Sequence, residues 1–315
     1  MAKYRGQLPQ LGDGLFATDG GLETTLIFDE GIELPSFAAF VLLDSDEGRA
    51  VLRKYFRSYG AIAARHGMGI VLESPTWRAN RDWGARLGHS RESLDRLNRE
   101  AIGLLVELRG EMEAGGKEPV VISGNIGPRG DGYSVSVRMS SAEAESYHRQ
   151  QIETFAQTEA DMVAAFTLNH VDEATGIARA ARAFGMPVAL SFTVETDGRL
   201  PDGQTLREAI EATDDATTGS AAYYMVNCAH PTHLEDALAE GGEWLSRLRG
   251  VRANASRKSH KELDEASALD AGDPRELGSQ YADLQRMLPF LSVVGGCCGT
   301  DQRHVDAICK ALTRG

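Results

Sequence analysis

Short runs of hydrophobic residues alternate along this chain with longer segments in which hydrophobic positions recur every three or four residues. The short runs are typical of strands buried on both faces, and the longer segments are typical of helices that pack one face on a core. The strands predicted in this way are residues 15–18, 69–72, 119–123, 161–166, 187–193, 222–227, 250–253 and 290–294.

Helices are predicted after most of these strands. In residues 46–66, Val51, Tyr55 and Ile62 fall on one side of a charged segment. Asp273-Pro274 marks another helix start, because Asp can cap a helix and Pro suits its first turn. The remaining predicted helices are residues 93–112, 141–159, 171–184, 205–212 and 233–247.

Eight units of strand followed by helix predict a parallel sheet that closes into a (β/α)8 barrel. An open doubly wound sheet is the alternative, but it would normally carry a glycine-rich phosphate loop after its first strand. The sequence DGGLET at 19–24 lacks the G-x-G-x-x-G spacing. Barrels of this kind often reach 315 residues, so residues 1–315 are predicted to form a single domain.

The charge of the chain indicates which partners to expect. With 33 basic and 46 acidic residues, the formal net charge of -13 argues against a nucleic acid or an anionic membrane surface as partner. No signal peptide or long apolar span is present, which predicts a cytoplasmic protein that acts on small molecules and leaves a homo-oligomer open. The polar segment 254–272 is predicted to be a solvated loop or helix over the mouth of the barrel.

The stretch SVVGGCCGT at residues 292–300 contains two adjacent cysteines enclosed by glycines. Neighbouring residues on a regular strand point to opposite faces, so Cys297 and Cys298 can reach one metal ion only if the backbone leaves the pleat, which glycine permits. Cys228 ends the predicted strand 222–227, so all three cysteines lie at the face where such barrels place their active sites. Three thiolates suit Zn²⁺ and leave its fourth tetrahedral position open for a substrate.

Three other arrangements of these cysteines remain open. They could form a disulfide, hold a closed structural zinc completed by His230 or His304, or be unreactive thiols buried in the core. Cys309 is predicted to be a core residue, because it lies with Val305 and Ile308 on the last helix.

These residues resemble the homocysteine S-methyltransferase family over nearly the whole chain. The most specific element is GGCCGT at 295–300, together with the upstream pair Asn227-Cys228. The resemblance implies a (β/α)8 barrel, a zinc ion held by the three cysteines, and transfer of a methyl group to the thiol of homocysteine to give methionine. It also covers Asp19-Gly20-Gly21, Gly127-Pro128, Ser191-Phe192-Thr193, Asp197-Gly198 and Asn254.

Candidate substrate contacts lie at several of these positions. Asp19 follows the first strand, where it could meet a ligand or simply cap the turn. Members of the family commonly carry Phe-Glu-Thr at the end of the fourth strand, where the glutamate helps to hold the amino group of homocysteine. Here the corresponding residues are Ala165, Phe166 and Thr167, so Phe166 takes the place of that glutamate. We therefore expect either that Asp19 alone recognises the amine or that the acceptor is a thiol whose amine is absent or modified. The full set of expected substrate contacts is Asp19, Gly20, Gly21, Thr167, Ser191 and Asn227.

The methyl donor of the family is a small sulfonium or ammonium compound, or methylated cobalamin or folate supplied by further domains. The chain leaves no room for such domains beside a barrel, so we expect an onium donor such as S-methylmethionine, S-adenosylmethionine or a betaine. Trp77 and Trp83 could hold its cationic group or could pack on the core. The alternative functions are methylation of a different thiol and non-catalytic binding of zinc or thiols. A zinc hydrolase, in which the metal ion activates water, is ranked last.

Overall fold

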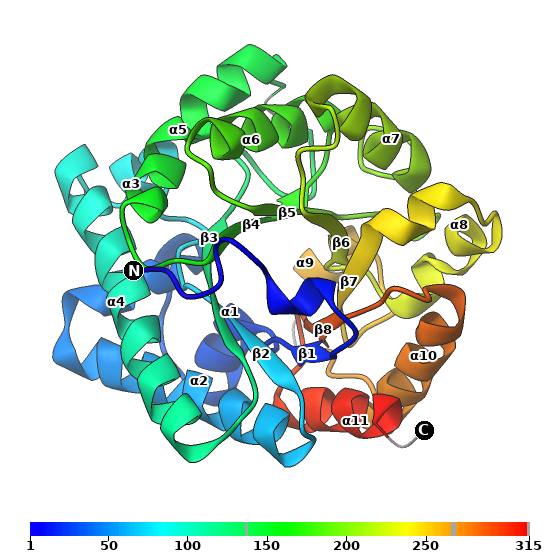
Figure 1. Ribbon diagram of the computed structural model, residues 1–315, viewed down its shortest axis with the longest axis horizontal. Helices are drawn as coiled ribbons and strands as arrows, with labels where there is room; N and C mark the ends of the chain where they lie inside the picture. The colour runs from blue at the N-terminus through cyan, green and yellow to red at the C-terminus, as the bar shows by residue number, and fades with distance from the viewer. Residues whose placement is uncertain (136–137, 266–268, 314–315) are drawn as a thin grey trace.

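The computed structural model describes residues 1–135, 138–265 and 269–313. Eight parallel strands follow one another in chain order and close into one barrel, because β8 pairs with β1 (Figure 1). The predicted (β/α)8 barrel is therefore confirmed. The strands are β1 (Phe16–Ala17), β2 (Gly69–Glu73), β3 (Val120–Ile126), β4 (Met162–Leu168), β5 (Val188–Phe192), β6 (Tyr223–Asn227), β7 (Leu248–Ala253) and β8 (Val293–Gly296).

Helices surround the barrel and cover the outer face of the strands (Figure 1). Side-chain caps fix where several of them begin, since Ser45, Ser90 and Ser140 each accept a hydrogen bond from a backbone amide of the first turn. No helix in the described part of the chain is long and apolar enough to cross a membrane. The helices are α1 (Leu22–Thr24), α2 (Asp46–Arg65), α3 (Arg81–Arg86), α4 (Arg91–Gly115), α5 (Ser141–Ala156), α6 (Val171–Ala183), α7 (Leu206–Thr217), α8 (Glu235–Ala239), α9 (His260–Asp264), α10 (Pro274–Met287) and α11 (Gln302–Leu312).

Residues 233–247 do not form the single helix that the sequence predicted. The short helix α8 lies between two 3₁₀ turns, at Pro231–His233 and Glu243–Arg247. Gly241 and Gly242 have φ angles of 66° and 118°, which end the helix because they lie in the left-handed region.

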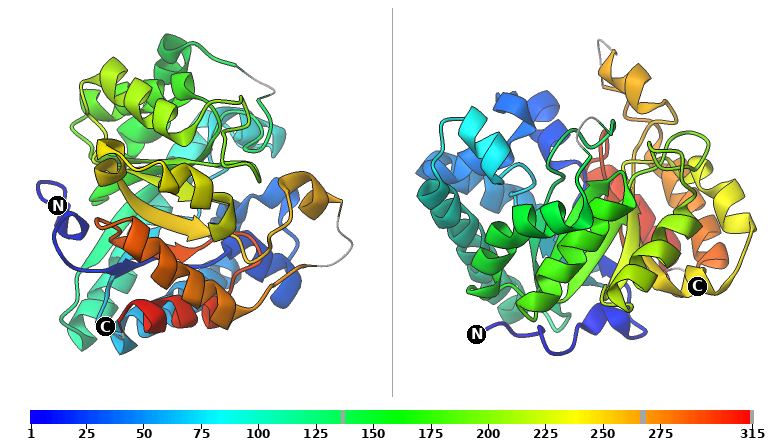
Figure 2. Two further views of the ribbon diagram at one scale, coloured as in Figure 1. Left: turned by 90° about the vertical axis from the view of Figure 1, so that its right-hand side faces the viewer. Right: turned by 90° about the horizontal axis from the view of Figure 1, so that it is seen from above.

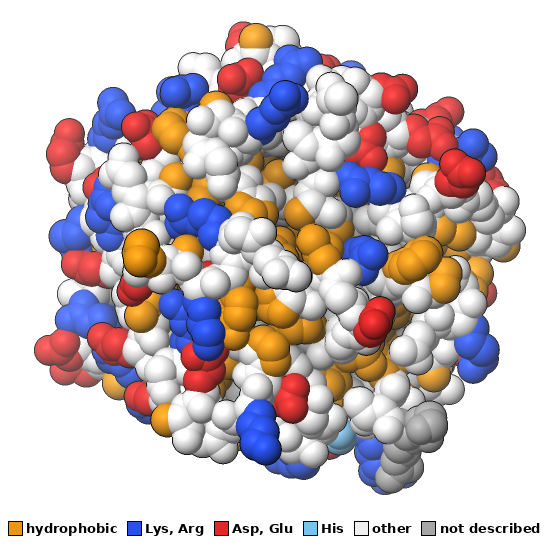
Figure 3. All heavy atoms as spheres, viewed as in Figure 1, with side chains coloured by type: hydrophobic (Ala, Val, Ile, Leu, Met, Phe, Trp, Pro, Cys, Tyr) orange, Lys and Arg blue, Asp and Glu red, His pale blue; other side chains and the backbone are white. Residues whose placement is uncertain are grey.

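The inside of the barrel is filled by alternate residues of the strands. Val71, Met162 and Tyr223 are buried there in one hydrophobic cluster, and Leu8 of the segment before β1 packs into it. Both views of Figure 2 place this segment at the opposite end of the barrel from α9, so it covers the end away from the strand carboxyl termini. Figure 3 shows hydrophobic side chains around the centre of this face and charged side chains mainly over the surrounding helices.

A buried carboxylate joins several elements at this amino-terminal end. Asp161, directly before β4, has no exposed surface. Its oxygens accept hydrogen bonds from the Arg109 guanidinium at 2.9 Å, the Ile122 amide at 2.9 Å and the Tyr4 amide at 2.7 Å. Asp161 therefore links α4, β3 and the amino-terminal segment.

Replacing Asp161 by Asn should lower the free energy of unfolding by about 3–5 kcal/mol, because the buried guanidinium of Arg109 would lose its counter-charge. Urea denaturation followed by circular dichroism measures the change. The control is Glu111→Gln, which breaks an exposed ion pair with Arg57 and should leave the urea midpoint unchanged. Equal midpoints for Asp161→Asn and the parent would show that the buried pair is not needed for stability.

Candidate metal and active site

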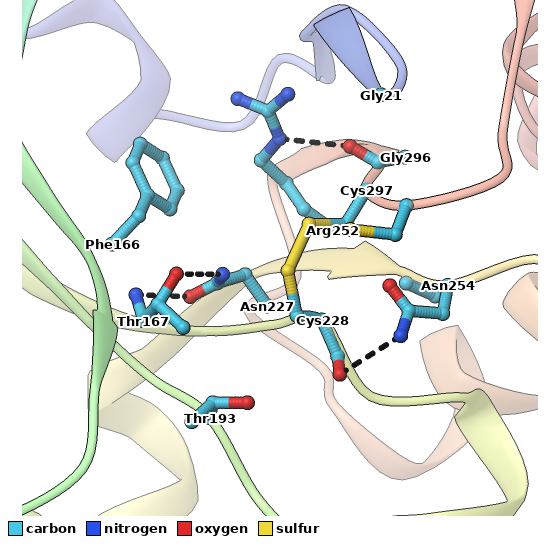
Figure 4. Close-up of a disulfide and its surroundings, with 12 residues drawn as sticks. Gly21, Phe166, Thr167, Thr193, Asn227, Cys228, Arg252, Asn254, Gly296 and Cys297 are labelled. Atoms are coloured by element: carbon cyan, nitrogen blue, oxygen red, sulfur yellow. Dashed lines mark hydrogen bonds between the residues drawn. A yellow bond between two sulfur atoms is a disulfide. The ribbon is translucent and has the colours of Figure 1, made fainter. Parts of the chain in front are cut away.

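The carboxyl-terminal ends of β6 and β8 bring three cysteine sulfurs together. Cys228 follows β6, and Cys297 and Cys298 follow β8. Their Sγ atoms all lie within 4.8 Å of one another, and no other described group of cysteine, histidine and carboxylate side chains is close enough to hold a metal ion. In the structure Cys228 and Cys297 are joined by a disulfide, one of the arrangements left open by the sequence (Figure 4). Three thiolates are therefore available to a metal ion only when this disulfide is reduced.

The backbone leaves regular strand geometry at these cysteines. Cys228 has a φ of 55°, and its carbonyl accepts a hydrogen bond from Asn254 Nδ2 at 3.0 Å. The amide of Cys297 donates to the carbonyl of Ala253 at 2.7 Å, and Gly299, with a φ of 76°, turns the chain two residues later. These turns let adjacent cysteines approach one point, as the metal prediction required.

Gly20 and Gly21 pack directly against the cysteine turn. A Cβ at Gly21 would lie 2.6 Å from the Cys297 carbonyl oxygen, and a Cβ at Gly20 would lie 2.9 Å from the Thr300 carbonyl oxygen. The Gly21 amide donates to that Thr300 carbonyl at 3.0 Å. Both glycines thus serve close packing, and the Gly21 amide is used within the protein rather than held ready for the substrate.

Asn227, Thr167 and Ser191 form one hydrogen-bonded group, and Figure 4 shows Asn227 and Thr167 of this group beside Cys228. Asn227 Oδ1 accepts hydrogen bonds from the Thr167 amide at 2.9 Å and the Ser191 hydroxyl at 2.7 Å. Asn227 Nδ2 donates to the Thr167 hydroxyl oxygen at 3.0 Å, and the group holds Thr167 at a φ of 63°. The Ser191 proton is used here, whereas the Thr167 hydroxyl proton has no partner among the described residues.

Asp19 is paired with Arg252, a residue of β7 to which the sequence analysis assigned no role. Arg252 Nη2 donates to Asp19 Oδ1 at 2.6 Å, and the Tyr55 hydroxyl donates to Oδ2 at 3.0 Å. Asp19 is 6% exposed; burial raises its pKa, and the Arg252 charge opposes that shift. Both oxygens thus already have a partner within the protein, and recognition of an amine by Asp19 alone stays a prediction.

The ring of Phe166 faces the same guanidinium, with its centroid 5.1 Å from Arg252 Cζ. Figure 4 shows the guanidinium and this ring on the same side of the disulfide. A single charge in the otherwise apolar strand 250–253 was the signal that could have identified Arg252 from the sequence.

Glu73, at the end of β2, is a second buried acid near this ion pair. Its side chain is 4% exposed, and Oε2 has no hydrogen-bond partner in the described part of the chain. Burial raises the pKa of Glu73 to about 7, and the Arg252 charge opposes the shift. This carboxyl group therefore changes its charge near neutral pH.

Tyr133, which the sequence analysis missed, contacts Cys298, and His260 packs on Tyr133. The Tyr133 hydroxyl, in the loop after β3, lies 3.8 Å from Cys298 Sγ. The Tyr133 ring lies on the imidazole of His260 in α9, with 4.1 Å between the centroids. Burial lowers the pKa of His260 to about 4, so its ring is neutral at pH 7. The polar segment 254–272 therefore contributes a residue to the site.

The two histidines considered as a fourth zinc ligand are engaged elsewhere. His230 Nδ1 lies 2.8 Å from the Thr232 hydroxyl, and His304 Nε2 lies 2.7 Å from the Ala271 carbonyl oxygen. Neither belongs to the cysteine group. Cys309 is a buried core residue, as predicted, and burial raises the pKa of its thiol to about 12.

Trp77 and Trp83 already hold a cation of the chain. Arg78 Cζ lies 4.0 Å from the Trp77 ring centroid and 3.8 Å from that of Trp83, and Arg86 Cζ lies 4.5 Å from the Trp83 centroid. Arginine side chains thus lie where an onium donor was expected, and we assign no donor contact to these rings.

A family model described as homocysteine S-methyltransferase matches residues 17–312. The chain belongs to this family. The matched range contains all eight strands apart from Phe16 of β1, and all three clustered cysteines. Membership of the homocysteine S-methyltransferase family makes the protein a methyltransferase.

Proteins named as homocysteine methyltransferases are similar to this chain, over most of the length of some and about half of others. Homocysteine S-methyltransferase 1 of Brassica oleracea var. italica is 23% identical over 323 residues, which cover 96% of this chain and 94% of the relative. Betaine–homocysteine S-methyltransferase 1 of Mus musculus is 26% identical over 190 residues, 55% of this chain and 45% of the relative. The oxidised form of the Escherichia coli homocysteine methyltransferase MmuM has the same fold, with a TM-score of 0.78 and 19% identity over 98% of this chain and 100% of that one.

The variants Cys228→Ser, Cys297→Ser and Cys298→Ser should each lose most of the bound zinc, because each removes one of three converging thiols. Reduced protein loaded with zinc and analysed by inductively coupled plasma mass spectrometry measures the metal content. Cys309→Ser is the matched control and should keep its zinc. Full zinc content in all three variants would rule out this site.

Replacing Glu73 by Gln should stabilise the protein relative to the parent increasingly as the pH rises from about 5 to 8. The folded-state pKa of about 7 lies above the ordinary 4.5. Folded parent therefore keeps a proton that the unfolded chain releases, and it loses stability across this window. At about 1.4 kcal/mol per pKa unit the gain is at most about 3 kcal/mol. Urea unfolding at several pH values measures it, and a difference that does not vary with pH would contradict the raised pKa.

Proposed function

We propose that the reduced protein binds one zinc ion through Cys228, Cys297 and Cys298 and transfers a methyl group from a small onium compound to a thiol of the homocysteine type. With homocysteine as the acceptor, the product is methionine. The observation that carries this proposal is the convergence of three cysteine sulfurs at one end of the barrel, in a chain of the homocysteine S-methyltransferase family.

The set of three thiols fits a catalytic zinc site. Such sites use three protein ligands and keep the fourth position for a substrate, and thiolates are preferred zinc ligands. A zinc ion bound here would keep the acceptor sulfur deprotonated at neutral pH, where a free thiol with a pKa of about 8.5 is mostly protonated.

The residues around the cysteines orient the acceptor and limit the access of water. Asn227 fixes the backbone and hydroxyl of Thr167, whose proton can then be donated to a polar group of the acceptor. The Tyr133 hydroxyl contacts Cys298 and the His260 ring packs on the Tyr133 ring, so this pair of rings would limit the access of water past Tyr133.

Methyl transfer from an onium compound to a thiolate needs no oxidant or reductant. The acceptor thiolate supplies the electron pair of the new sulfur–carbon bond, and the electrons of the broken bond stay on the donor sulfur or nitrogen, which becomes neutral. The mouse relative is named for betaine, a donor of this class. The candidate donors are S-methylmethionine, S-adenosylmethionine and betaine.

Reduced, zinc-loaded protein should form methionine from homocysteine and at least one of these donors, without cobalamin, folate or nicotinamide. Mass spectrometry of the product measures the reaction. Cys298→Ser should lower the rate to background, because the variant loses a zinc ligand, and Cys309→Ser should retain the parent rate.

Two results would contradict this proposal. Activity that appears only after cobalamin or folate is added would exclude the onium class of donor. No methylation of any thiol by any donor would favour a non-catalytic protein that binds zinc or thiols.

A further inference from the structure

The guanidinium of Arg252 is fixed directly beside the cysteine turn. Its Nε donates to the carbonyl of Gly296, the residue before Cys297, at 3.0 Å. Its Nη2 donates to Asp19 Oδ1 at 2.6 Å and to the Gly20 carbonyl at 3.0 Å. Three hydrogen bonds thus set the position of this charge relative to the turn that carries two of the three sulfurs.

The Nη1 edge of the same guanidinium is unused. An arginine has five N–H donors, of which Nε and Nη2 account for three here. Among the residues that the structure describes, none accepts a hydrogen bond from Nη1, although Arg252 is only 8% exposed. Nη1 is not among the buried polar atoms that lack a partner, so it reaches solvent, and this edge is open to a ligand that brings acceptor oxygens.

The side chains in direct contact with the Arg252 guanidinium offer no free acid to an ammonium group. Asp19 has its charge matched by Arg252 and its second oxygen bonded to Tyr55. On the β4 side, Phe166 presents an aromatic ring 5.1 Å from the guanidinium carbon instead of an acid. Two further buried acids, Glu23 and Glu73, raise the pKa of Arg252 through their charge, but among the described residues only Asp19 forms an ion pair with it.

We propose that Arg252 recognises the carboxylate of the acceptor through Nη1, so that the enzyme selects thiol carboxylic acids whether or not they carry an amine. This inference rests on the proposed transfer of a methyl group to a thiol and names the group by which that thiol is selected. Nη2 stays on Asp19 while Nη1 binds the ligand, because a guanidinium can bind acceptors on separate edges. Homocysteine fits this rule, and so does 4-sulfanylbutanoate, which is the same chain without the amine.

Product analogues test this recognition without a methyl donor. Methionine carries both groups, 4-(methylsulfanyl)butanoate lacks the amine, and 3-(methylsulfanyl)propylamine lacks the carboxylate. Isothermal titration calorimetry of the reduced, zinc-loaded protein should give the first two dissociation constants within about threefold of each other. The amine should bind about 30-fold more weakly or worse, because it leaves the Arg252 charge without a partner.

The variant Arg252→Lys separates charge from geometry. Lysine keeps a positive charge against Asp19 but has no second planar edge, so binding of both carboxylates should weaken by about tenfold or more. Arg109→Lys is the matched control, since it makes the same change in the buried pair with Asp161 at the other end of the barrel and should leave binding unchanged. Circular dichroism checks that the variant folds. If Arg252→Lys does not fold, the dissociation constants of the three product analogues for the parent protein test the inference.

The inference is overturned if 3-(methylsulfanyl)propylamine binds as well as methionine, if removing the amine weakens binding about 30-fold, or if none of the three binds. Assays with the corresponding thiols distinguish this failure from that of the proposed function. Methylation of homocysteine but not of 4-sulfanylbutanoate would overturn the carboxylate inference alone. The expected binding order without methylation of any thiol would support carboxylate recognition and contradict the proposed reaction.

Discussion

The close approach of β8 to β1 is the constraint on which the site depends. A Cβ at Gly295 would lie 1.9 Å from the Thr18 hydroxyl oxygen, and a Cβ at Gly296 would lie 2.0 Å from that of Thr300. Glycine at both positions therefore lets the last strand close the barrel against the first strand and the turn that follows. This closure brings the adjacent cysteines next to the loop after β1 and within reach of Cys228 at the end of β6.

Closure also places a buried ion pair in the barrel. Arg252 extends from β7 to the loop after β1, where it meets Asp19, while Phe166 covers it from β4. A buried ion pair adds little net stability, because desolvation of the two charges offsets their attraction. The pair instead affects the chemistry of the site. The charge of Asp19 is matched by Arg252, and the Nη1 group of Arg252 remains beside the cysteine turn.

The barrel could be predicted because eight buried strands alternate with amphipathic helices, and the cysteine cluster because the carboxyl ends of parallel strands share one face. The pairing of Asp19 with Arg252 could not be predicted, since it joins residues 233 positions apart through barrel closure. The choice between disulfide and metal depends on oxidation, which no sequence pattern records. The prediction of a single helix over residues 233–247 was wrong because Gly241 and Gly242 interrupt an otherwise helical pattern.

Zinc K-edge X-ray absorption on the reduced, zinc-loaded protein tests the central claim, that three cysteine sulfurs and the acceptor sulfur share one metal ion. The expected spectrum has three sulfur ligands at about 2.3 Å and one lighter ligand. Addition of homocysteine or 4-sulfanylbutanoate should replace the lighter ligand with a fourth sulfur. A ligand set that includes histidine nitrogen, or one that gains no sulfur with either thiol, would contradict the proposed chemistry.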